Sequence, residues 1–496
     1  MPIERREDGC TDIQYSDPIM NLICICLDTF RADMIGNSGK LSFVETPNLD
    51  AFAGDSVCFD RAFGEGQPTL QIRRAMFTGR RSFPWRYNFD RRGHWHHAAG
   101  WHKIPPEQDT LAEMLLSRGY ATGLVADTYH MFKPTMNYSR GFVSYDFIRG
   151  QESDNWRICS DKRIEEQMKK HVREPINWKR HDTLIQYLMN MQDRKTEDDY
   201  LCAKVFRSAS RWLEDIVDNQ PFFLWVDSFD PHEPWDPPKS YADKYCPDYD
   251  GKDFIMPGAA YEGTQPSEEE IRRIKALYFG EASFVDKWVG CLLDKIDSLK
   301  LWDDTVVMVT CDHGTQIMDH GSFGKGPNKL HPFNTQILWY IRHPDGPRGT
   351  HVNGFVQSHD LVPTMLNLLG IEYTFCDGEN VWPLVTGEMA SIRDHVVTGW
   401  AGWGDGNASG RASVRDDQWN YVVAVGQEDP NPELYHLPSD ADEKKNVISE
   451  HPDVVKKQKT RLEAVLGHPL PATQNEVCDR AAPPPGSRYR ATRYAR

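Results

Sequence analysis

Three residues of types that bind metal ions follow two strongly apolar segments of the chain. Asp28 comes directly after the largely apolar residues 21–27, and Asp312 and His313 come directly after residues 305–311. Carboxylate oxygens bind hard divalent cations, and a histidine among the ligands shifts the preference towards zinc, manganese or iron. Each acid taken alone is more often a cap at a strand end. Taken together, the three residues predict a metal site.

These residues need a sheet that brings their strands together. Residues 21–28, 221–230 and 305–314 are each apolar on both faces and end in acids, with Asp230 closing the second segment. Such strands belong in the middle of a parallel sheet. In open α/β sheets, chemistry gathers at the carboxyl ends of the strands. The acids at the three strand ends are therefore expected at one edge of the sheet.

Helices are expected between and around these strands. Helical patterns cover residues 46–55, 71–79, 109–120, 155–219, 267–299 and 360–370, and further strands are expected at 56–63, 121–127 and 336–341. The alternation of strands and helices predicts an α/β sandwich. We divide the chain into a large α/β domain over residues 1–380, an antiparallel subdomain over 381–470 and a Pro-rich basic tail over 471–496.

The overall charge and the cysteines limit the partners and the compartment. A net charge of -16 argues against binding nucleic acid or an anionic membrane, so an anionic substrate needs a local positive site. The N-terminus lacks the apolar core of a signal peptide, and no run of about 18 apolar residues occurs. Cys24, Cys26 and Cys311 lie in apolar runs, which favours buried reduced thiols. We therefore expect a cytoplasmic protein.

Several segments resemble the sulfatase family, in the family's order, over roughly residues 20–450. The family's opening is similar to LDTFRADMIG with TPNLDAFA, and its second metal motif to VTCDHGTQIMDHG with GKG just after. Its late helix and C-terminal subdomain are similar to HDLVPTMLNLLGI and ELYHLPSDADEKKNV. The resemblance implies an alkaline-phosphatase-like α/β/α sandwich with a smaller C-terminal antiparallel α+β subdomain. It also implies one divalent metal ion on Asp28, Asp312 and His313. The histidine favours manganese or zinc, with calcium as the alternative.

The same resemblance places Thr69 where sulfatases carry the cysteine or serine that becomes formylglycine. Counting back from Thr78 and Gly79 aligns residues 69–73 with that motif, and Arg73 matches its arginine. Threonine cannot be converted to formylglycine, but a metal-bound threonine is the nucleophile in other members of the alkaline-phosphatase superfamily. A bound divalent cation stabilises the alkoxide, and a helix start adds N–H donors. The alternatives are a threonine that only caps the helix and a pseudoenzyme that lost its nucleophile.

The resemblance assigns further residues of the pocket. His232, in SFDPHEPWDPP, matches a histidine that can act as general acid on the leaving oxygen. Lys325 matches the lysine that binds the charged oxygens of the substrate, and Lys329 is a nearby competitor for this role. Arg73 is expected to neutralise the metal-bound nucleophile or to contact the substrate anion.

One cation pair of the sulfatases is missing. The family's Lys-x-His pair falls on Asp127 and Tyr129, and neither residue matches. This loss removes much of the machinery suited to a sulfate ester, and we keep Tyr129 as a substrate-binding residue. Phosphonate monoester hydrolases and phosphodiesterases also lack the pair and match His232 and Lys325. The chain is more similar to that group than to true sulfatases, although the group usually carries formylglycine.

Two further sets of residues have open roles. Residues 86–102 hold four histidines and two tryptophans, namely His94, His96, His97, His102, Trp95 and Trp101. Their spacing fits no tight metal motif, so a loop at the rim of the pocket is favoured over a second metal site or surface packing. A two-metal site would draw on Asp230, His232, His331 and His359.

We therefore expect a hydrolase of phosphodiesters or phosphonate monoesters that forms a covalent intermediate on Thr69. The rival hypotheses are a sulfuric ester hydrolase without formylglycine and a non-catalytic binding protein on the same scaffold. The retained acids, arginine, histidine and lysine weigh against a binding protein. The expected partner is a small anionic ester, without nucleic acid or membrane, and the extended tail is compatible with a homo-oligomer.

Overall fold

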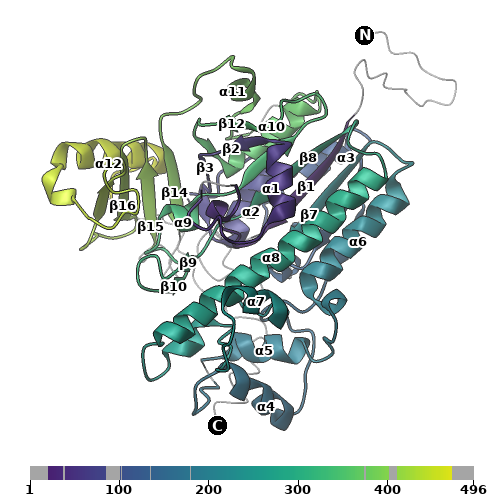
Figure 1. Ribbon diagram of the computed structural model, residues 1–496. Helices are drawn as coiled ribbons and strands as arrows, with labels where there is room; N and C mark the ends of the chain where they lie inside the picture. Colours follow the sequence, from purple (N-terminus) through teal and green to yellow (C-terminus); the bar gives the residue numbers. More distant parts are fainter. Residues whose placement is uncertain are drawn as a thin grey trace.

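The chain folds around one large twisted sheet, as the computed structural model shows (Figure 1). The structure describes residues 20–36, 39–84, 101, 103–133, 136–178, 180–373, 376–400 and 410–471. The eight strands of the sheet run in the order β12-β2-β11-β8-β1-β7-β5-β6. Their bounds are β1 Asn21–Leu27, β2 Val57–Phe59, β5 Ala121–Ala126, β6 Ser144–Phe147, β7 Phe222–Ser228, β8 Thr305–Cys311, β11 Trp339–Arg342 and β12 Thr350–Val352.

The predicted parallel centre of the sheet is confirmed. β1 lies between β7 and β8 and is parallel to both, and every residue of these three strands is buried. The register pairs Leu27 with Ser228 on one side and with Cys311 on the other. The next residue on β1 is Asp28 and the next on β8 is Asp312, so the register alone brings these two acids together at the carboxyl edge. The antiparallel β11 lies beyond β8.

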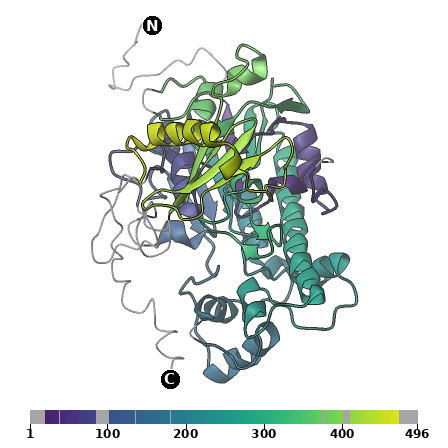
Figure 2. The same cartoon turned by 90° about the vertical axis from the view of Figure 1, so that its left-hand side faces the viewer.

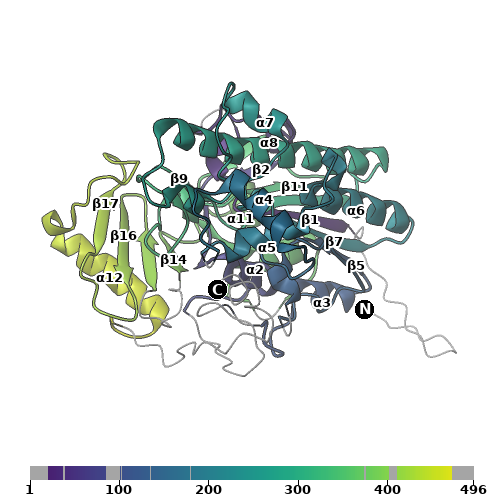
Figure 3. The same cartoon turned by 90° about the horizontal axis from the view of Figure 1, so that it is seen from below.

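Helices cover both faces of the sheet, which confirms the α/β/α sandwich (Figure 3). One face carries α1 Pro47–Gly54, α6 Leu201–Ile216, α7 Lys239–Tyr245 and α8 Glu268–Ser298, which pack together. The other carries α2 Thr69–Thr78, α3 Leu111–Leu116 and α10 Leu361–Leu368. The helical stretch expected over 155–219 contains α4 Asp161–His171 and α5 Asp182–Asn190 as well as α6. The smaller elements are β3 Ala62–Phe63, β9 Gln316–Ile317, β10 Phe323–Gly324, β13 Val356–Gln357, α9 Pro332–Thr335 and α11 Trp382–Thr386.

A second sheet forms the predicted C-terminal antiparallel subdomain (Figure 2). Its strands are β14 Val396–Trp400, β15 Arg411–Arg415, β16 Trp419–Ala424 and β17 Glu433–His436, and α12 Pro452–Leu466 packs on it. The short strand β4, Gly66–Gln67, adds to this sheet beside β14 and directly precedes Pro68 and α2. The C-terminal sheet is thus hydrogen-bonded to the segment that leads into the candidate nucleophile. The domain limits at 380 and 470 stay predictions.

The start of α2 differs from the sequence expectation. The helix was expected from about residue 71, but it begins at Thr69, and the cap position before it is Pro68. Thr69 is therefore the first helical residue and not the cap, which corrects the alternative in which its side chain only caps the helix. The end agrees with the expectation, because Gly79 adopts the left-handed conformation with φ 64° directly after Thr78.

The nine cysteines in the described part of the chain all carry free thiols. Cys24, Cys26 and Cys311 are buried in the central strands, and burial raises the pKa of each thiol, so they remain protonated and inert. In the described ranges, no helix combines the length and apolar character needed to cross a bilayer.

The buried, neutral state of His359 can be tested through the pH dependence of the chain's stability. The His359 side chain is fully buried, neither ring nitrogen has a hydrogen-bond partner among the described residues, and burial lowers its pKa from 6.5 to about 3. Between these two pH values the unfolded chain takes up a proton at His359 that the folded chain does not. The folded state therefore loses stability as the pH falls, by at most about 1.4 kcal/mol per pH unit.

The variant His359→Leu lacks this loss. Its free energy of unfolding, measured by chemical denaturation, should rise relative to that of the wild-type chain as the pH falls from about 7 to about 5. Parallel pH curves for the two proteins would contradict the buried, neutral state of His359.

Candidate active site

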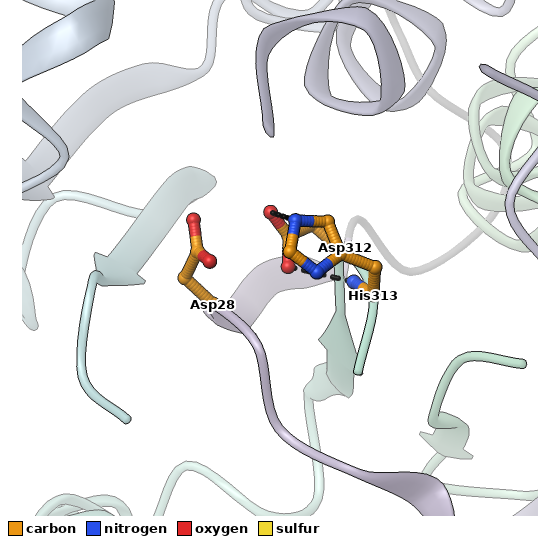
Figure 4. A group of neighbouring side chains, drawn as sticks. All are labelled: Asp28, Asp312 and His313. Atoms are coloured by element: carbon orange, nitrogen blue, oxygen red, sulfur yellow. Dashed lines mark hydrogen bonds and ion pairs between the residues drawn. The ribbon is translucent and has the colours of Figure 1, made fainter. Parts of the chain in front are cut away.

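Asp28, Asp312 and His313 converge at the carboxyl edge of the central sheet (Figure 4). All three are fully buried, and one potential ligand atom from each lies within 4.8 Å of the others. Among the described residues this is the one group of three or more histidine, cysteine or acidic side chains with such an arrangement. The strand register accounts for the two acids, and His313 follows Asp312 directly.

The state of His313 fits a metal ligand. Its Nδ1 lies 2.9 Å from the carbonyl oxygen of Gly314, which can only accept, so Nδ1 carries the proton. The lone pair is then on Nε2, which has no hydrogen-bond partner in the described structure. Burial lowers the pKa of His313 to about 3, so the ring is neutral near pH 7. A buried acceptor without a donor is costly unless a cation or water meets it, and the site therefore fits a metal ion.

Arg73 connects this group to a third acid, Asp227 on β7. Its Nη1 lies 3.0 Å from Asp28 Oδ2 and 2.6 Å from Asp312 Oδ2, and its Nη2 lies 2.8 Å from Asp227 Oδ1. All four side chains have no exposed surface. Three negative charges and one positive charge leave a formal charge of two negatives, which is the charge that one divalent cation neutralises.

Sequence reasoning missed Asp227 and chose Asp230 instead. Asp227 stands inside the apolar run of β7, where a charged residue is unusual, and this was the available signal. Asp230 accepts hydrogen bonds from Gln151 and from the backbone of Cys202, so it is turned away from the ligand group. Arg73 was expected to neutralise the nucleophile or to contact the substrate. The structure places its guanidinium among the three carboxylates, and both expected roles stay predictions.

Thr69 lies beside this charged cluster. Its carbonyl oxygen accepts a hydrogen bond of 3.3 Å from Nη1 of Arg73, the nitrogen that also meets Asp28 and Asp312. The residue is 3% exposed, and its hydroxyl makes no hydrogen bond to the described part of the chain. As the first residue of α2, Thr69 lies where the free N–H groups of a helix favour an anion.

Lys325, in the loop after β10, contacts the ligand group through Thr29. Its Nζ lies 3.0 Å from Thr29 Oγ1 and 2.9 Å from Glu233 Oε2. Thr29 in turn donates to Asp28 Oδ1 at 2.7 Å and holds Asp312 Oδ1 with its backbone N–H at 2.9 Å. The competitor Lys329 donates to the carbonyl of Phe323 instead. The structure therefore distinguishes the two lysines in favour of Lys325.

The side chains of His232 and Tyr129 both lie beside the carboxylate of Glu152. His232 Nδ1 lies 2.6 Å from the carbonyl oxygen of Glu233 and 3.8 Å from Glu152 Oε1. The ring stacks on Phe229, and Nε2 makes no hydrogen bond to the described residues, so it is the nitrogen available to a substrate. The Tyr129 hydroxyl donates to Glu152 Oε2 at 2.7 Å, and burial raises the pKa of Tyr129.

Residues considered for a second metal ion are not brought together in the ranges that the structure describes. His331 pairs with Glu443 of the C-terminal subdomain at 2.7 Å, and His359 is buried without contact to the ligand group. Asp127, at the position of the sulfatase lysine, accepts hydrogen bonds from Gln151 and from the backbone of Phe229. His94, His96, His97, His102 and Trp95 lie outside the described residues, and Trp101 packs against His130.

The fold and the site define a hydrolase scaffold of the alkaline-phosphatase superfamily. The Sulfatase family model matches residues 20–371, and the chain belongs to the sulfatase family of hydrolases. Enzymes of this family generally use a divalent metal ion, and the ligand group of this chain is compatible with one.

Individual relatives are distant. The multifunctional alkaline phosphatase superfamily protein PehA of Trinickia caryophylli is 24% identical over 416 residues, which are 74% of this chain and 77% of that protein. Arylsulfatase K of Xenopus laevis is 25% identical over 317 residues, which are 56% of this chain and 59% of that protein. The phosphonate monoester hydrolase of Agrobacterium radiobacter superposes with a TM-score of 0.68 at 21% identity, over 90% of this chain and 95% of its own. This likeness confirms the fold.

Metal content tests the ligand group. Asp28→Asn and His313→Ala should each reduce the divalent metal retained after dialysis by at least about tenfold, because each removes one ligand from a small set. Asp319→Asn is the matched control, since Asp319 lies six residues after His313 but pairs with Arg31. Elemental analysis of the purified proteins gives the stoichiometry. Unchanged metal content in both ligand variants, or equal loss in the control, would remove this group from metal binding.

Proposed function

We propose that the chain hydrolyses phosphodiesters or phosphonate monoesters through a covalent intermediate on Thr69. The observation that carries the proposal is the position of Thr69. It is the first residue of α2, its hydroxyl makes no hydrogen bond to the described chain, and its carbonyl binds the guanidinium that holds Asp28 and Asp312. The hydroxyl of Thr29 also lies near the ligand group, but it donates a hydrogen bond to Asp28.

Asp28, Asp312, His313 and the Thr69 hydroxyl are the residues that would hold a metal ion. Such an ion supplies Lewis acidity, which lowers the pKa of a bound hydroxyl and stabilises charge on a transferred phosphoryl group. The neutral histidine with its free Nε2 favours manganese or zinc over calcium, because calcium prefers oxygen ligands alone.

The remaining residues divide the other tasks. The Thr69 hydroxyl releases its proton to solvent and its oxygen attacks phosphorus, the bond from phosphorus to the leaving oxygen breaks, and Nε2 of His232 delivers the proton that this oxygen needs. Lys325 holds a charged oxygen of the substrate, Tyr129 contributes its ring to the substrate-binding wall while its hydroxyl donates to Glu152, and Arg73 keeps the acids and the start of α2 in place. A water molecule then attacks phosphorus and gives a proton to Nε2 of His232, the bond to Thr69 breaks, and the threonine oxygen takes up a proton from solvent.

The features of the pocket favour phosphorus esters over sulfate esters. Threonine cannot form the aldehyde hydrate of sulfatases, and Asp127 and Tyr129 replace the cation pair of that family. The relative PehA is named a multifunctional alkaline phosphatase superfamily protein, and the similar solved structure is a phosphonate monoester hydrolase. We further propose a cytoplasmic location, which the nine free thiols in the described residues support.

A turnover panel tests the proposal. Wild-type protein is assayed on an aryl phosphodiester, a phosphonate monoester, a phosphate monoester and a sulfate ester. We expect the first two to be the preferred substrates. Thr69→Ala should lower their kcat by at least about a thousandfold, whereas Thr69→Ser, which keeps a hydroxyl, should retain most of it.

Thr78→Ala provides the matched control, because it makes the same change at the far end of the same helix. Diester hydrolysis that survives in Thr69→Ala would remove Thr69 from its role. Preferred turnover of the sulfate ester would favour the sulfuric ester hydrolase, and absence of all turnover in a metal-loaded wild-type protein would favour the binding protein.

A further inference from the structure

Glu233 contacts both of the residues that are proposed to handle the substrate's charge. Its backbone carbonyl accepts from Nδ1 of His232 at 2.6 Å, and its carboxylate Oε2 lies 2.9 Å from Nζ of Lys325. The carboxylate is 16% exposed and the lysine is 11% exposed, so solvent screens this ion pair only weakly. One residue therefore fixes the general acid through its main chain and neutralises the substrate-binding lysine through its side chain.

Within the described part of the chain, the hydrogen bonds of Lys325 leave one of its three N–H donors free. An ammonium group has three N–H bonds. One is directed to Thr29 Oγ1 at 3.0 Å and another to Glu233 Oε2 at 2.9 Å. The third is the one that remains for a substrate oxygen. This geometry matches a substrate that presents a single charged oxygen to the lysine.

The formal charges around the pocket also favour a substrate with a single negative charge. The acids Asp28, Asp227 and Asp312 with Arg73 are neutralised by one divalent cation, as counted above. Lys325 and Glu233 neutralise each other, so this ion pair adds no net positive charge towards the substrate. Burial alone would raise the pKa of Glu233, but Lys325 and His232 hold it below its ordinary value, so the carboxylate stays ionised.

We propose that Glu233 is a specificity-determining residue, which sets the pocket for esters with one negative charge and against esters with two. The proposal rests on the function proposed above and names the residue that selects the substrate's charge. Phosphodiesters and phosphonate monoesters carry one charge, whereas a phosphate monoester carries nearly two above its second pKa of about 6. In a poorly solvated pocket the second charge has no partner, and burying an unpaired charge is expensive.

The variant Glu233→Gln removes the charge and keeps an oxygen for Lys325. At pH 8, the ratio of kcat/KM for a phosphate monoester to kcat/KM for a phosphodiester should rise by at least about tenfold, since Lys325 then meets the second charge unopposed. A purely structural role for Glu233 would lower both rates together and leave the ratio unchanged. That outcome would overturn the proposal.

Two further variants test whether Glu233 changes this ratio through Lys325. In the Lys325→Met background, Glu233→Gln should no longer change the ratio, because its partner is gone. Glu152→Gln is the matched control, since Glu152 also lies beside His232 but forms no ion pair with Lys325 in the described structure. An equal rise in Glu152→Gln, or a rise that persists in the Lys325→Met background, would show that Glu233 does not act through Lys325.

Binding provides a readout that does not depend on turnover. Metal-loaded wild-type and Glu233→Gln proteins are titrated by calorimetry at pH 8 with inorganic phosphate, which is mostly dianionic, and with dimethyl phosphate, a monoanion. Phosphate should bind the variant about tenfold more tightly, with a smaller change for dimethyl phosphate. Equal changes for both anions would overturn the proposal. If the wild-type protein binds these anions but hydrolyses no phosphorus ester, the proposed function fails and the charge selection by Glu233 is still decided.

Discussion

The guanidinium of Arg73 holds three carboxylates from three neighbouring strands, and the rest of the site depends on this contact. Asp28 follows β1, Asp227 lies on β7 and Asp312 follows β8. All three carboxylates contact the side chain of Arg73, and none of the four side chains is exposed to solvent. Three acids at one edge of a sheet repel each other, and burial raises the pKa of Asp28, with Asp312 adding to the effect. Removing one partner from such a buried set costs about 3–5 kcal/mol, because the others remain charged and buried.

Arg73 belongs to α2, so the same contact also fixes that helix against the sheet. The start of α2 is additionally held by β4, which adds to the C-terminal sheet beside β14. Thr69 is therefore positioned from two sides, by the charge cluster of the large sheet and by the backbone pairing of the small one. The backbone of Thr69 is thereby fixed beside the charged cluster, although its hydroxyl makes no hydrogen bond to the described chain. The C-terminal sheet, remote in sequence, becomes part of the site's support.

Much of this architecture was predictable, for identifiable reasons. Asp28, Asp312 and His313 end strands that are apolar on both faces, and strand ends of a parallel sheet meet at one edge. Asp227 was missed because its role arises from its ion pair with Arg73, which is far away in sequence. The choice between Lys325 and Lys329 also needed the structure, since both lie in one glycine-rich loop and only the fold decides which lysine turns inward.

The helix start at Thr69 shows the same limit of local patterns. A threonine after proline has the composition of a cap, yet the helix begins about two residues earlier than predicted, and the hydroxyl makes no hydrogen bond within the described chain. Glu233 was likewise invisible as a functional residue, because its importance comes from the pairing of its side chain with Lys325. Where chemistry depends on charges assembled from different strands and loops, the sequence identifies the ends of strands but not the partners.

The central claim is that Thr69 is the nucleophile, and trapping the intermediate tests it most directly. Metal-loaded protein is mixed with an aryl phosphodiester, quenched in acid during the first turnover and digested for mass spectrometry. We expect a phosphoryl ester on Thr69 that appears with the burst of aryl alcohol and disappears as hydrolysis proceeds. A competent, turning-over enzyme whose Thr69 peptide stays unmodified at every time point, or one that carries the phosphoryl group on another residue, would contradict it.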